Sequence, residues 1–281
     1  VVIKLLKKKN MIPLSLKKIA IITNGQLYGR DLVINDIVID TKQVTLGCLF
    51  IALKGKQFDA YIFIKEAVNK GCAAIISQKK INYNVSYIIV EDTSIALGKI
   101  ASWIRQKINP KILAITGSCG KTSVKEMTKS ILEKNKKIIS TIDNLNNHIG
   151  VPITLIRLTK KHKYGVIELG ANNPGEISYT SNIAQPNTVL INNIYHAHLQ
   201  GFKSLLGVSK AKSEILSGLR SQGTVIINLD SNHLSQWKKK IKNKNVFYFS
   251  IEKKKKVIFF LLTLQYIQIK HVLPCTHHLV K

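Results

Sequence analysis

The chain has 281 residues, 45% of them hydrophobic, which is enough for one large domain or two ordinary ones. The longest apolar run near the C-terminus, Val257–Leu262, is far shorter than the ~20 residues that span a bilayer, and no signal-type segment is evident, so we expect no membrane insertion and a cytoplasmic protein. The formal net charge is +28, but only four of the 43 basic residues are arginines and the lysines are scattered, which favours biased codon usage over nucleic-acid binding.

The first part of the chain reads as a small α/β domain. Met11 offers an alternative start, so we expect residues 1–10 to be a non-native or disordered leader. The pattern then predicts helices over 14–25, 61–71 and 94–108, and strands over 33–40, 48–55, 72–77 and 86–92. Residue 109 precedes a proline and therefore disfavours helix, which marks a domain boundary. The sequence thus predicts an N-terminal domain over 11–109.

The second part, residues 110–281, reads as repeated β-α units. We expect strands over 112–115, 136–141, 164–170, 188–194, 223–230 and 246–250, and helices over 124–134, 204–219 and 234–243. After Ser250 a lysine run precedes two possible β segments. Apolar strands alternating with helices indicate a parallel sheet covered on both faces, in which ligands bind at the carboxyl ends of the strands. The loops after Ile115, Gly170 and Asn193 should therefore converge on one crevice.

A glycine loop between an apolar strand and a helix is the main candidate for a site. Its pattern T-G-x-x-G-K-T is shorter than the general G-x-x-x-x-G-K-[ST], because Ile115 stands where the first glycine is expected. At such a helix N-terminus, backbone N–H groups surround an anion, Lys121 can neutralise phosphates, and Thr122 can bind Mg²⁺. A glycine turn with an incidental lysine is the alternative. The predicted nucleotide-binding residues are Thr116, Gly117, Ser118, Cys119, Gly120, Lys121, Thr122 and Ser123.

Further candidates follow other strands. Glu168 ends an apolar strand, where a carboxylate is poorly placed unless it meets a cation; it is a candidate Mg²⁺ ligand or simply an exposed strand end. His196 and His198 both follow the strand at 188–194, and their spacing does not choose between them. On the next helix, Lys210 and Lys212 point to different faces, and a solvated lysine is the default for either.

An asparagine-rich loop, 143–152, lies close to the phosphate site in the sequence. Its amides offer hydrogen-bond donors and acceptors for a ligand, although asparagine also commonly forms turns. The candidates are Asn144, Asn146 and Asn147.

Five stretches, in this order, resemble the Mur ligases of peptidoglycan synthesis. They are DTKQVTLGCLFIALKG, AITGSCGKTSVKEM, NLNNHIGVPITLIRL, VIELGANNPGEI and INNIYHAHLQGFKSLLGVSKAKSEI. The resemblance covers roughly residues 11–250. It implies an N-terminal uridine-nucleotide-binding domain and a P-loop parallel-sheet ATPase domain. It also implies that the chain is incomplete at its C-terminus and lacks the family's C-terminal ligase domain.

The resemblance also implies roles for individual residues. Residues 116–123 would bind ATP, with Lys121, Lys212 and His198 as catalytic residues. The Mg²⁺ ligands would be Thr122, Glu168, His198 and Lys212, the last as a carbamate. The substrate would be contacted by Thr41, Lys42, Asn144, Asn146 and Asn147. Lys42 stands where the family usually has arginine, so the bidentate fork of a guanidinium is lost.

The implied activity is ATP-dependent amide ligation through an acyl phosphate, with UDP-N-acetylmuramoyl-tripeptide and D-alanyl-D-alanine as substrates and ATP and Mg²⁺ as cofactors. We expect a monomer. Because the third domain is expected to be absent, the leading hypothesis is ligase ancestry with a chain that is inactive on its own. The alternatives are a non-catalytic binder of nucleotide or UDP-sugar-peptide, and a nucleic-acid binder that exploits the positive charge.

Overall fold

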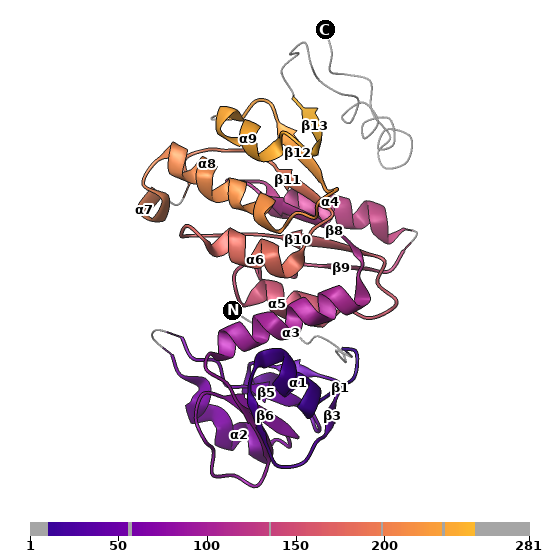
Figure 1. The fold of residues 1–281 in the computed structure, drawn as a ribbon, viewed down its shortest axis with the longest axis vertical. Coiled ribbons are helices and arrows are strands. Elements are labelled where there is room, and N and C mark those ends of the chain that lie inside the picture. Colours follow the sequence, from indigo (N-terminus) through magenta and orange to yellow (C-terminus); the bar gives the residue numbers. More distant parts are fainter. Residues whose placement is uncertain (1–10, 56–57, 135, 198, 232–233, 251–281) are drawn as a thin grey trace, which may run out of the picture.

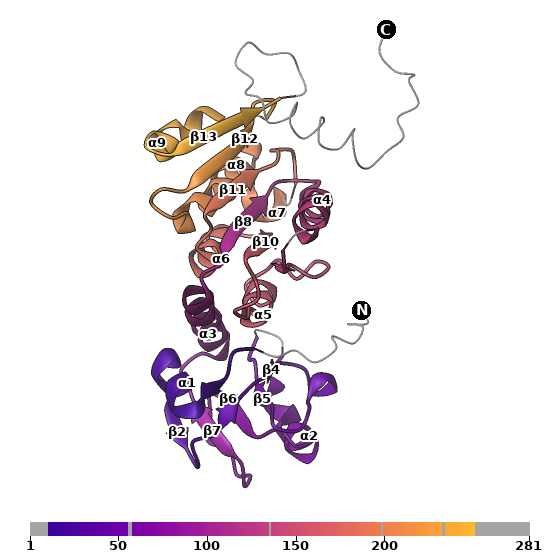
Figure 2. The same ribbon diagram turned by 90° about the vertical axis from the view of Figure 1, so that its right-hand side faces the viewer.

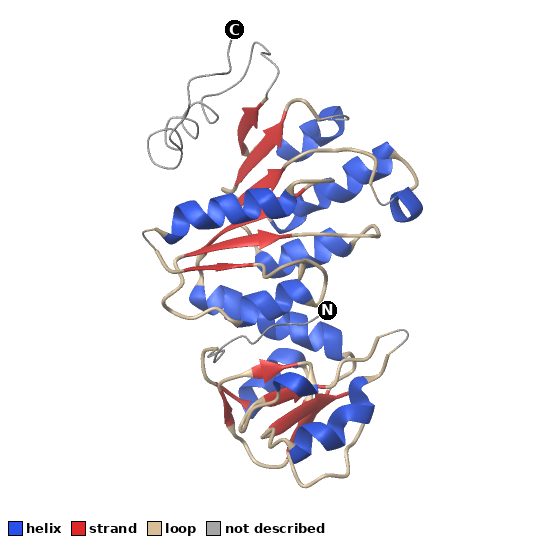
Figure 3. Cartoon of the chain, turned by 180° about the vertical axis from the view of Figure 1, so that it is seen from behind, coloured by secondary structure: helices blue, strands red, loops and turns tan. Residues whose placement is uncertain are grey.

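A computed structural model describes residues 11–55, 58–134, 136–197, 199–231 and 234–250. Two sheets occupy opposite ends of an elongated molecule, and helices lie between them (Figures 1 and 3). Within the described residues, no helix is both long enough and apolar enough to cross a membrane. The expected leader, residues 1–10, and the expected β segments after Ser250 lie outside the described residues.

The N-terminal sheet has the strand order β2-β7-β6-β5-β4 in the described chain. Its strands are parallel except β2, which runs antiparallel to β7. A separate antiparallel pair joins β1 to β3. The strands are β1 (Leu14–Ser15), β2 (Gln26–Tyr28), β3 (Val33–Ile34), β4 (Ile37–Val38), β5 (Leu49–Ile51), β6 (Ala74–Ser77) and β7 (Ser86–Ile89). The helices are α1 (Leu16–Thr23), α2 (Ile64–Asn69) and α3 (Thr93–Ile108), with 3₁₀ turns η1 (Thr41–Gln43) and η2 (Ala60–Phe63).

Capping residues set the ends of these helices. The Ser15 hydroxyl accepts a hydrogen bond from the Lys18 N–H at the start of α1, and Asn24 ends that helix in the left-handed conformation. Asp92 caps α3 by accepting from two backbone N–H groups. The single strand predicted over 33–40 is wrong: the chain forms β3 and β4, which belong to two different sheets.

The second sheet is wholly parallel, with the order β13-β12-β11-β8-β10-β9 among the described strands. Its strands are β8 (Lys111–Thr116), β9 (Ile138–Ser140), β10 (Tyr164–Glu168), β11 (Thr188–Ile191), β12 (Thr224–Asn228) and β13 (Asn245–Phe249). Its helices are α4 (Lys121–Glu133), α5 (Gly150–Ile156), α6 (Glu176–Ala184), α7 (Leu199–Phe202), α8 (Leu205–Ser213) and α9 (Lys238–Ile241), with 3₁₀ turns η3 (Glu214–Gly218) and η4 (Leu234–Trp237).

Both faces of this sheet are covered, as predicted for parallel strands. Alternate strand residues such as Ile115, Val166 and Leu190 form one apolar cluster with side chains of α4. The opposite face, which includes Ala114 and Ile167, packs into the main core together with α5, α6 and α8. Figure 2 shows α4 and α6 on opposite sides of the strands. The predicted parallel α/β fold is confirmed.

Helix α3 joins the two sheets. It packs against α1 on one side and against α5 and α6 on the other, and one apolar cluster runs from Ile76 in the first sheet to Ile112 in the second. Gly98 allows close packing here, because an added Cβ would lie 2.2 Å from the Tyr179 hydroxyl oxygen. The fully buried Arg105 donates hydrogen bonds to the carbonyls of Ala184 and Gln185 at the end of α6.

Two other helix predictions need correction. The helix predicted over 234–243 is the 3₁₀ turn η4 followed by the short helix α9. The helix predicted over 204–219 is α-helical only through Ser213 and continues as the 3₁₀ turn η3. Helices α5 and α6 were not predicted at all.

Candidate functional site: a glycine loop and a strand-end carboxylate

The glycine loop runs from the end of β8 to the start of α4. Gly120 precedes α4 with a φ of 72°, in the left-handed region that favours glycine. An added Cβ at Gly120 would lie 3.0 Å from the Asn192 Nδ2 atom, so close approach also favours glycine at this position. The predicted strand, loop and helix are therefore present where the phosphate-site interpretation needs them.

Hydrogen bonds from the loop that follows β11 hold this turn in place. Asn193 Oδ1 accepts a hydrogen bond from the Cys119 N–H at 3.0 Å, and its Nδ2 donates to the Cys119 carbonyl at 3.1 Å. Asn192 Nδ2 donates to the same carbonyl. Ser118 exchanges hydrogen bonds with the backbone of Tyr195. The loops after β8 and β11 therefore meet, as the sheet topology predicted.

Lys121 is the first residue of α4, and its side chain folds back over the loop. Its Nζ donates to the Gly117 carbonyl at 2.9 Å and lies 3.4 Å from the Ser118 carbonyl oxygen. The ammonium therefore lies beside the concave loop and the helix N-terminus, where partial positive charge already favours an anion. The arrangement is suited to a phosphate group.

Glu168 lies beside the same helix. It is the last residue of β10 and only 2% exposed. One carboxylate oxygen accepts from the Thr122 hydroxyl at 2.9 Å, and the other accepts from Asn146 Nδ2 at 2.8 Å. Among the described residues, no lysine, arginine or histidine forms an ion pair with it.

This donor set fits a divalent cation. A buried carboxylate that meets only neutral donors has a charge that a cation could compensate. The carboxylate of Glu168 and the hydroxyl of Thr122 are oxygen ligands of the kind that Mg²⁺ prefers, and bound phosphates usually complete such a shell. The described residues contain no cluster of three histidine, cysteine or acidic side chains, so they contain no metal cage made of such residues alone.

Lys212 is the buried member of the predicted lysine pair. It is 1% exposed, whereas Lys210 is exposed. The pKa of Lys212 is lowered to about 8, chiefly by burial and secondly by the nearby Lys121 ammonium, while Glu214 and Glu176 act in the opposite direction. Its Nζ lies 5.6 Å from the centre of the Phe202 ring. The structure thus buries Lys212 and leaves Lys210 in solvent, a difference that spacing alone did not predict.

The three predicted asparagines behave differently from one another. Asn146 reaches Glu168, as described above. Asn147 instead caps the start of α5, because its Oδ1 accepts from the N–H groups of Ile149 and Gly150. Asn144 is exposed, and its carbonyl accepts from the Asn146 N–H.

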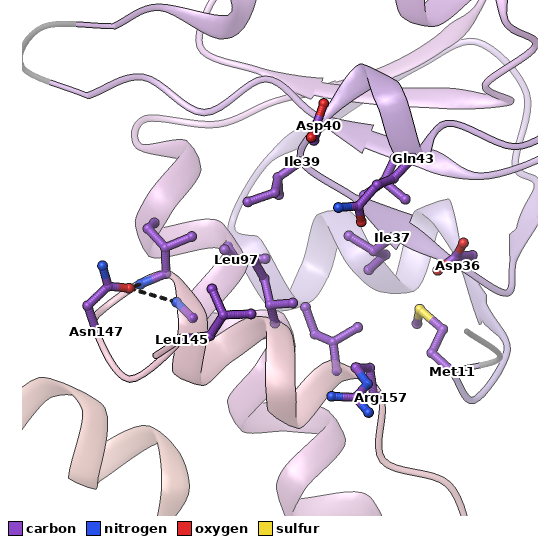
Figure 4. A pocket seen from close by; sticks show the side chains of 15 residues that line it. Met11, Asp36, Ile37, Ile39, Asp40, Gln43, Leu97, Leu145, Asn147 and Arg157 are labelled. Carbon is purple, nitrogen blue, oxygen red and sulfur yellow. Dashed lines mark hydrogen bonds between the residues drawn. The ribbon is translucent and has the colours of Figure 1, made fainter. Parts of the chain in front are cut away.

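A pocket of about 370 Å³ lies between the N-terminal sheet and α5 (Figure 4). Its walls are mostly aliphatic, and its polar side chains include Asp40 and Gln43 on one side and Asn147 on the other. Asp40 and Gln43 flank the predicted substrate residues Thr41 and Lys42, which do not themselves line the pocket. Thr41 is buried and Lys42 is exposed. The structure therefore places the neighbours of these two residues across the pocket from Asn147.

The predicted ligand His198 lies outside the described residues, and His196 is exposed. Three residues of the site were not predicted. Asn193 holds the backbone of Cys119, the Thr141 hydroxyl accepts from the Glu168 N–H, and the Lys125 ammonium donates to the Thr141 carbonyl. Asn193 and Thr141 each follow a strand of the parallel sheet, so the strand-end rule that found Glu168 could have found them.

The parallel sheet, the glycine loop that opens α4 and the carboxylate at the end of the neighbouring strand define a protein of the P-loop α/β class. A family model described as the Mur ligase middle domain matches residues 115–272, more than half of the chain. The chain belongs to the Mur ligase family.

Known proteins resemble it over most of its length. The UDP-N-acetylmuramoyl-tripeptide–D-alanyl-D-alanine ligase of Buchnera aphidicola subsp. Acyrthosiphon pisum (strain APS) is 71% identical over 250 residues, covering 89% of this chain and 55% of the relative. A crystal structure of MurF from Acinetobacter baumannii is 36% identical with a TM-score of 0.82, covering 85% of this chain and 54% of that one. MurF ligase from Thermotoga maritima in complex with ADP is 28% identical with a TM-score of 0.70, covering 80% and 52%. The chain thus spans about half the length of the relatives it matches.

Proposed function

We propose that this chain carries the nucleotide site and part of the UDP-substrate site of an ATP-dependent ligase. The ligase would join D-alanyl-D-alanine to UDP-N-acetylmuramoyl-tripeptide in cytoplasmic peptidoglycan synthesis. The observation that carries the proposal is the group formed by the glycine loop, Lys121, Thr122 and Glu168 at one sheet edge. The names of the similar proteins support the substrates, and the ADP complex of the Thermotoga relative supports the nucleotide.

The loop residues 116–123 would hold the phosphates of ATP. The backbone N–H groups at the N-terminus of α4 face the anion, and Lys121 would leave the loop carbonyls to contact the phosphates. Its cation would stabilise charge that builds up on the transferred phosphoryl group. In this step the tripeptide carboxylate would attack the γ-phosphorus of ATP, the bond to the β–γ bridging oxygen would break, and an acyl phosphate and ADP would form. The D-alanyl-D-alanine amine would then displace phosphate and form the amide bond.

Thr122 and Glu168 would hold Mg²⁺ beside these phosphates, where the ion supplies neutralisation of phosphate charge. We include His198 among the proposed ligands on the strength of the sequence resemblance alone. Asn146 would orient the Glu168 carboxylate through its hydrogen bond.

Lys212 would be carbamylated. Only the neutral amine reacts with carbon dioxide, and burial together with the nearby Lys121 lowers the pKa of Lys212 to about 8, which raises the neutral fraction near pH 7. Carbamylation converts a buried cation into an anion, so the charge at this position would change from one that repels a metal ion to one that attracts it.

The pocket between the N-terminal sheet and α5 would take part of the UDP-linked substrate. Residues on both sides of Thr41 and Lys42 line it, and Asn147 lies on the opposite wall. Its aliphatic walls and few polar groups are typical of a small-molecule site. Thr41, Lys42 and Asn144 would contact substrate outside the pocket itself.

Calorimetry on the full chain tests the proposal. We expect ATP to bind with Mg²⁺ dependence, and UDP-N-acetylmuramoyl-tripeptide to bind independently of ATP. Lys121→Met should weaken ATP binding and leave UDP-substrate binding unchanged. An assay of phosphate release with all three substrates tests the expectation that the chain is inactive on its own. Release that depends on D-alanyl-D-alanine would overturn this expectation, whereas binding of both ligands without release agrees with it. A chain that binds neither ligand would refute the proposal.

A further inference from the structure

Lys125 is a buried lysine that the proposed reaction does not use. It lies one helical turn after Lys121 on α4 and is 0% exposed. A buried ammonium is costly unless its protons are bound, and three acceptors surround this one. Its Nζ donates to the Thr141 carbonyl at 2.9 Å, lies 3.3 Å from the Asp143 carbonyl oxygen and forms an ion pair with Glu126 at 3.0 Å.

The two carbonyls belong to the start of the loop 141–146, which leads from β9 toward α5. Asp143 has a φ of 46°, in the left-handed region, and the Leu145 N–H donates to the Ile142 carbonyl, so the loop turns here. Because Lys125 binds main-chain oxygens, it fixes the path of the backbone itself. The loop is thereby held against the helix that begins at the phosphate site.

Both ends of this loop also form hydrogen bonds with β10 or with the residues that follow β10. At the start, the Thr141 hydroxyl accepts from the Glu168 N–H at 2.9 Å. At the end, Asn146 donates to the Glu168 carboxylate at 2.8 Å, and its carbonyl accepts from the Gly170 N–H at 2.9 Å. The position of the loop therefore determines whether Asn146 can reach Glu168.

These contacts close a ring. Helix α4 provides Thr122 to one oxygen of Glu168, and through Lys125 it holds the loop that provides Asn146 to the other oxygen. We propose that Lys125 is a positioning residue for Glu168, which fixes the loop 141–146 so that both carboxylate oxygens keep their partners. The inference rests on the proposed function, because it assigns Lys125 to the Mg²⁺-dependent nucleotide site.

The test compares Lys125→Met with Lys129→Met in the full chain. Lys129 lies one turn further along α4 and pairs with the same Glu126, but within the described residues no hydrogen bond joins its ammonium to a loop carbonyl, so it is a matched control. The probe is ATP, titrated calorimetrically with Mg²⁺ and again with EDTA. We expect Lys125→Met to weaken binding in Mg²⁺ by about 10-fold or more, as outer-shell substitutions do, and to leave binding in EDTA nearly unchanged.

Two further measurements separate positioning from general damage. The Gly170 N–H donates a hydrogen bond to the Asn146 carbonyl. In the metal-free protein, Lys125→Met should speed hydrogen exchange at this N–H, whereas Lys129→Met should not. Lys125→Arg keeps the charge and the donors and should recover most of the Mg²⁺-dependent affinity. Should Lys125→Met fail to fold, Asn146→Ala breaks the other end of the same path, and we expect the same selective loss.

Several results would overturn the inference. Equal losses in Mg²⁺ and in EDTA would show a structural role only, and unchanged Mg²⁺-dependent affinity in Lys125→Met or Asn146→Ala would show no role. A wild-type chain that binds ATP without any Mg²⁺ dependence would refute the proposed metal site and this inference with it. Wild-type Mg²⁺ dependence together with a normal Lys125→Met variant would refute this inference alone.

Discussion

Replacing Lys212 with methionine should stabilise the protein near pH 7. The difference between the ordinary pKa of 10.5 and the lowered value of about 8 corresponds to about 3 kcal/mol of unfavourable free energy for the charged form. The cation–π contact between its Nζ and the Phe202 ring stabilises the wild type by about 1 kcal/mol, and methionine cannot reproduce it fully, so this amount is subtracted from the gain in stability. We therefore expect Lys212→Met to raise the free energy of unfolding by about 2 kcal/mol.

This gain should disappear at alkaline pH. Between about pH 8 and pH 10.5 the folded protein binds fewer protons at Lys212 than the unfolded chain does, so rising pH favours the folded state of the wild type. The methionine variant has no such group. The difference in stability between the two proteins should therefore be full below about pH 8 and should vanish as the pH approaches 10.5.

Urea unfolding in buffers free of carbon dioxide measures this difference from about pH 7 to about pH 10. Lys210→Met is the matched control, because Lys210 is exposed on the same helix and its replacement should change little. A Lys212→Met protein that is less stable than the wild type at pH 7 would refute the reasoning. So would a stability difference that does not shrink as the pH rises.

Three other substitutions test the glycine loop, and a fourth, at Gly175, serves as a control. Lys121→Met should weaken ATP binding by about 10-fold to 100-fold, the value of a charged hydrogen bond, without lowering the melting temperature; calorimetry and thermal unfolding check this. Gly120→Ala should cost about 1–2 kcal/mol or more in urea unfolding, since its φ is 72° and Asn192 stands 3.0 Å from the new Cβ. Gly175→Ala, with a φ of 89° but open space, should cost less, and equal costs would argue against the close approach. Asn193→Ala should lower the free energy of unfolding by about 1–2 kcal/mol and should also weaken ATP binding, because the backbone N–H and carbonyl of Cys119 each lose a hydrogen bond. Unchanged ATP affinity would contradict the role of Asn193 in holding the loop.

Thr122 and Glu168 could be paired from the sequence because a simple rule governs them. One follows the strand β8 after a short loop, the other ends β10, and parallel strands bring their carboxyl ends to the same edge. The structure places the two side chains in hydrogen-bond contact at 2.9 Å. Lys212 needed more than spacing, since helical geometry separates it from Lys210 but does not say which of them is buried.

The asparagine loop shows what the sequence could not supply. Three asparagines were equivalent candidates in the sequence, and only the folded path of the loop shows that Asn146 contacts Glu168 while Asn147 caps α5. Lys125 was unpredictable for a related reason. In a chain with net charge +28, a lysine on a helix is expected in solvent, and only the tertiary path of the loop gives it acceptors.

Helix α5 escaped prediction because it is buried nearly all round. Six of its seven residues are buried, so no polar face alternates with an apolar one to give a helical period. The strand predicted over 33–40 is wrong for a different reason. The apolar and polar pattern indicates extended backbone but does not show that the chain leaves one sheet and enters another between β3 and β4.

The position of α3 has a thermodynamic consequence. The apolar cluster that includes α3 also includes residues of both sheets, so separating the sheets would expose a shared core to water. We therefore expect a single cooperative unfolding transition. Ligand binding at either end then stabilises the whole described chain. A nucleotide bound at the glycine loop should raise the melting temperature of the N-terminal sheet as much as that of the second, with no contact to its strands. The two binding regions would thus be linked through stability alone.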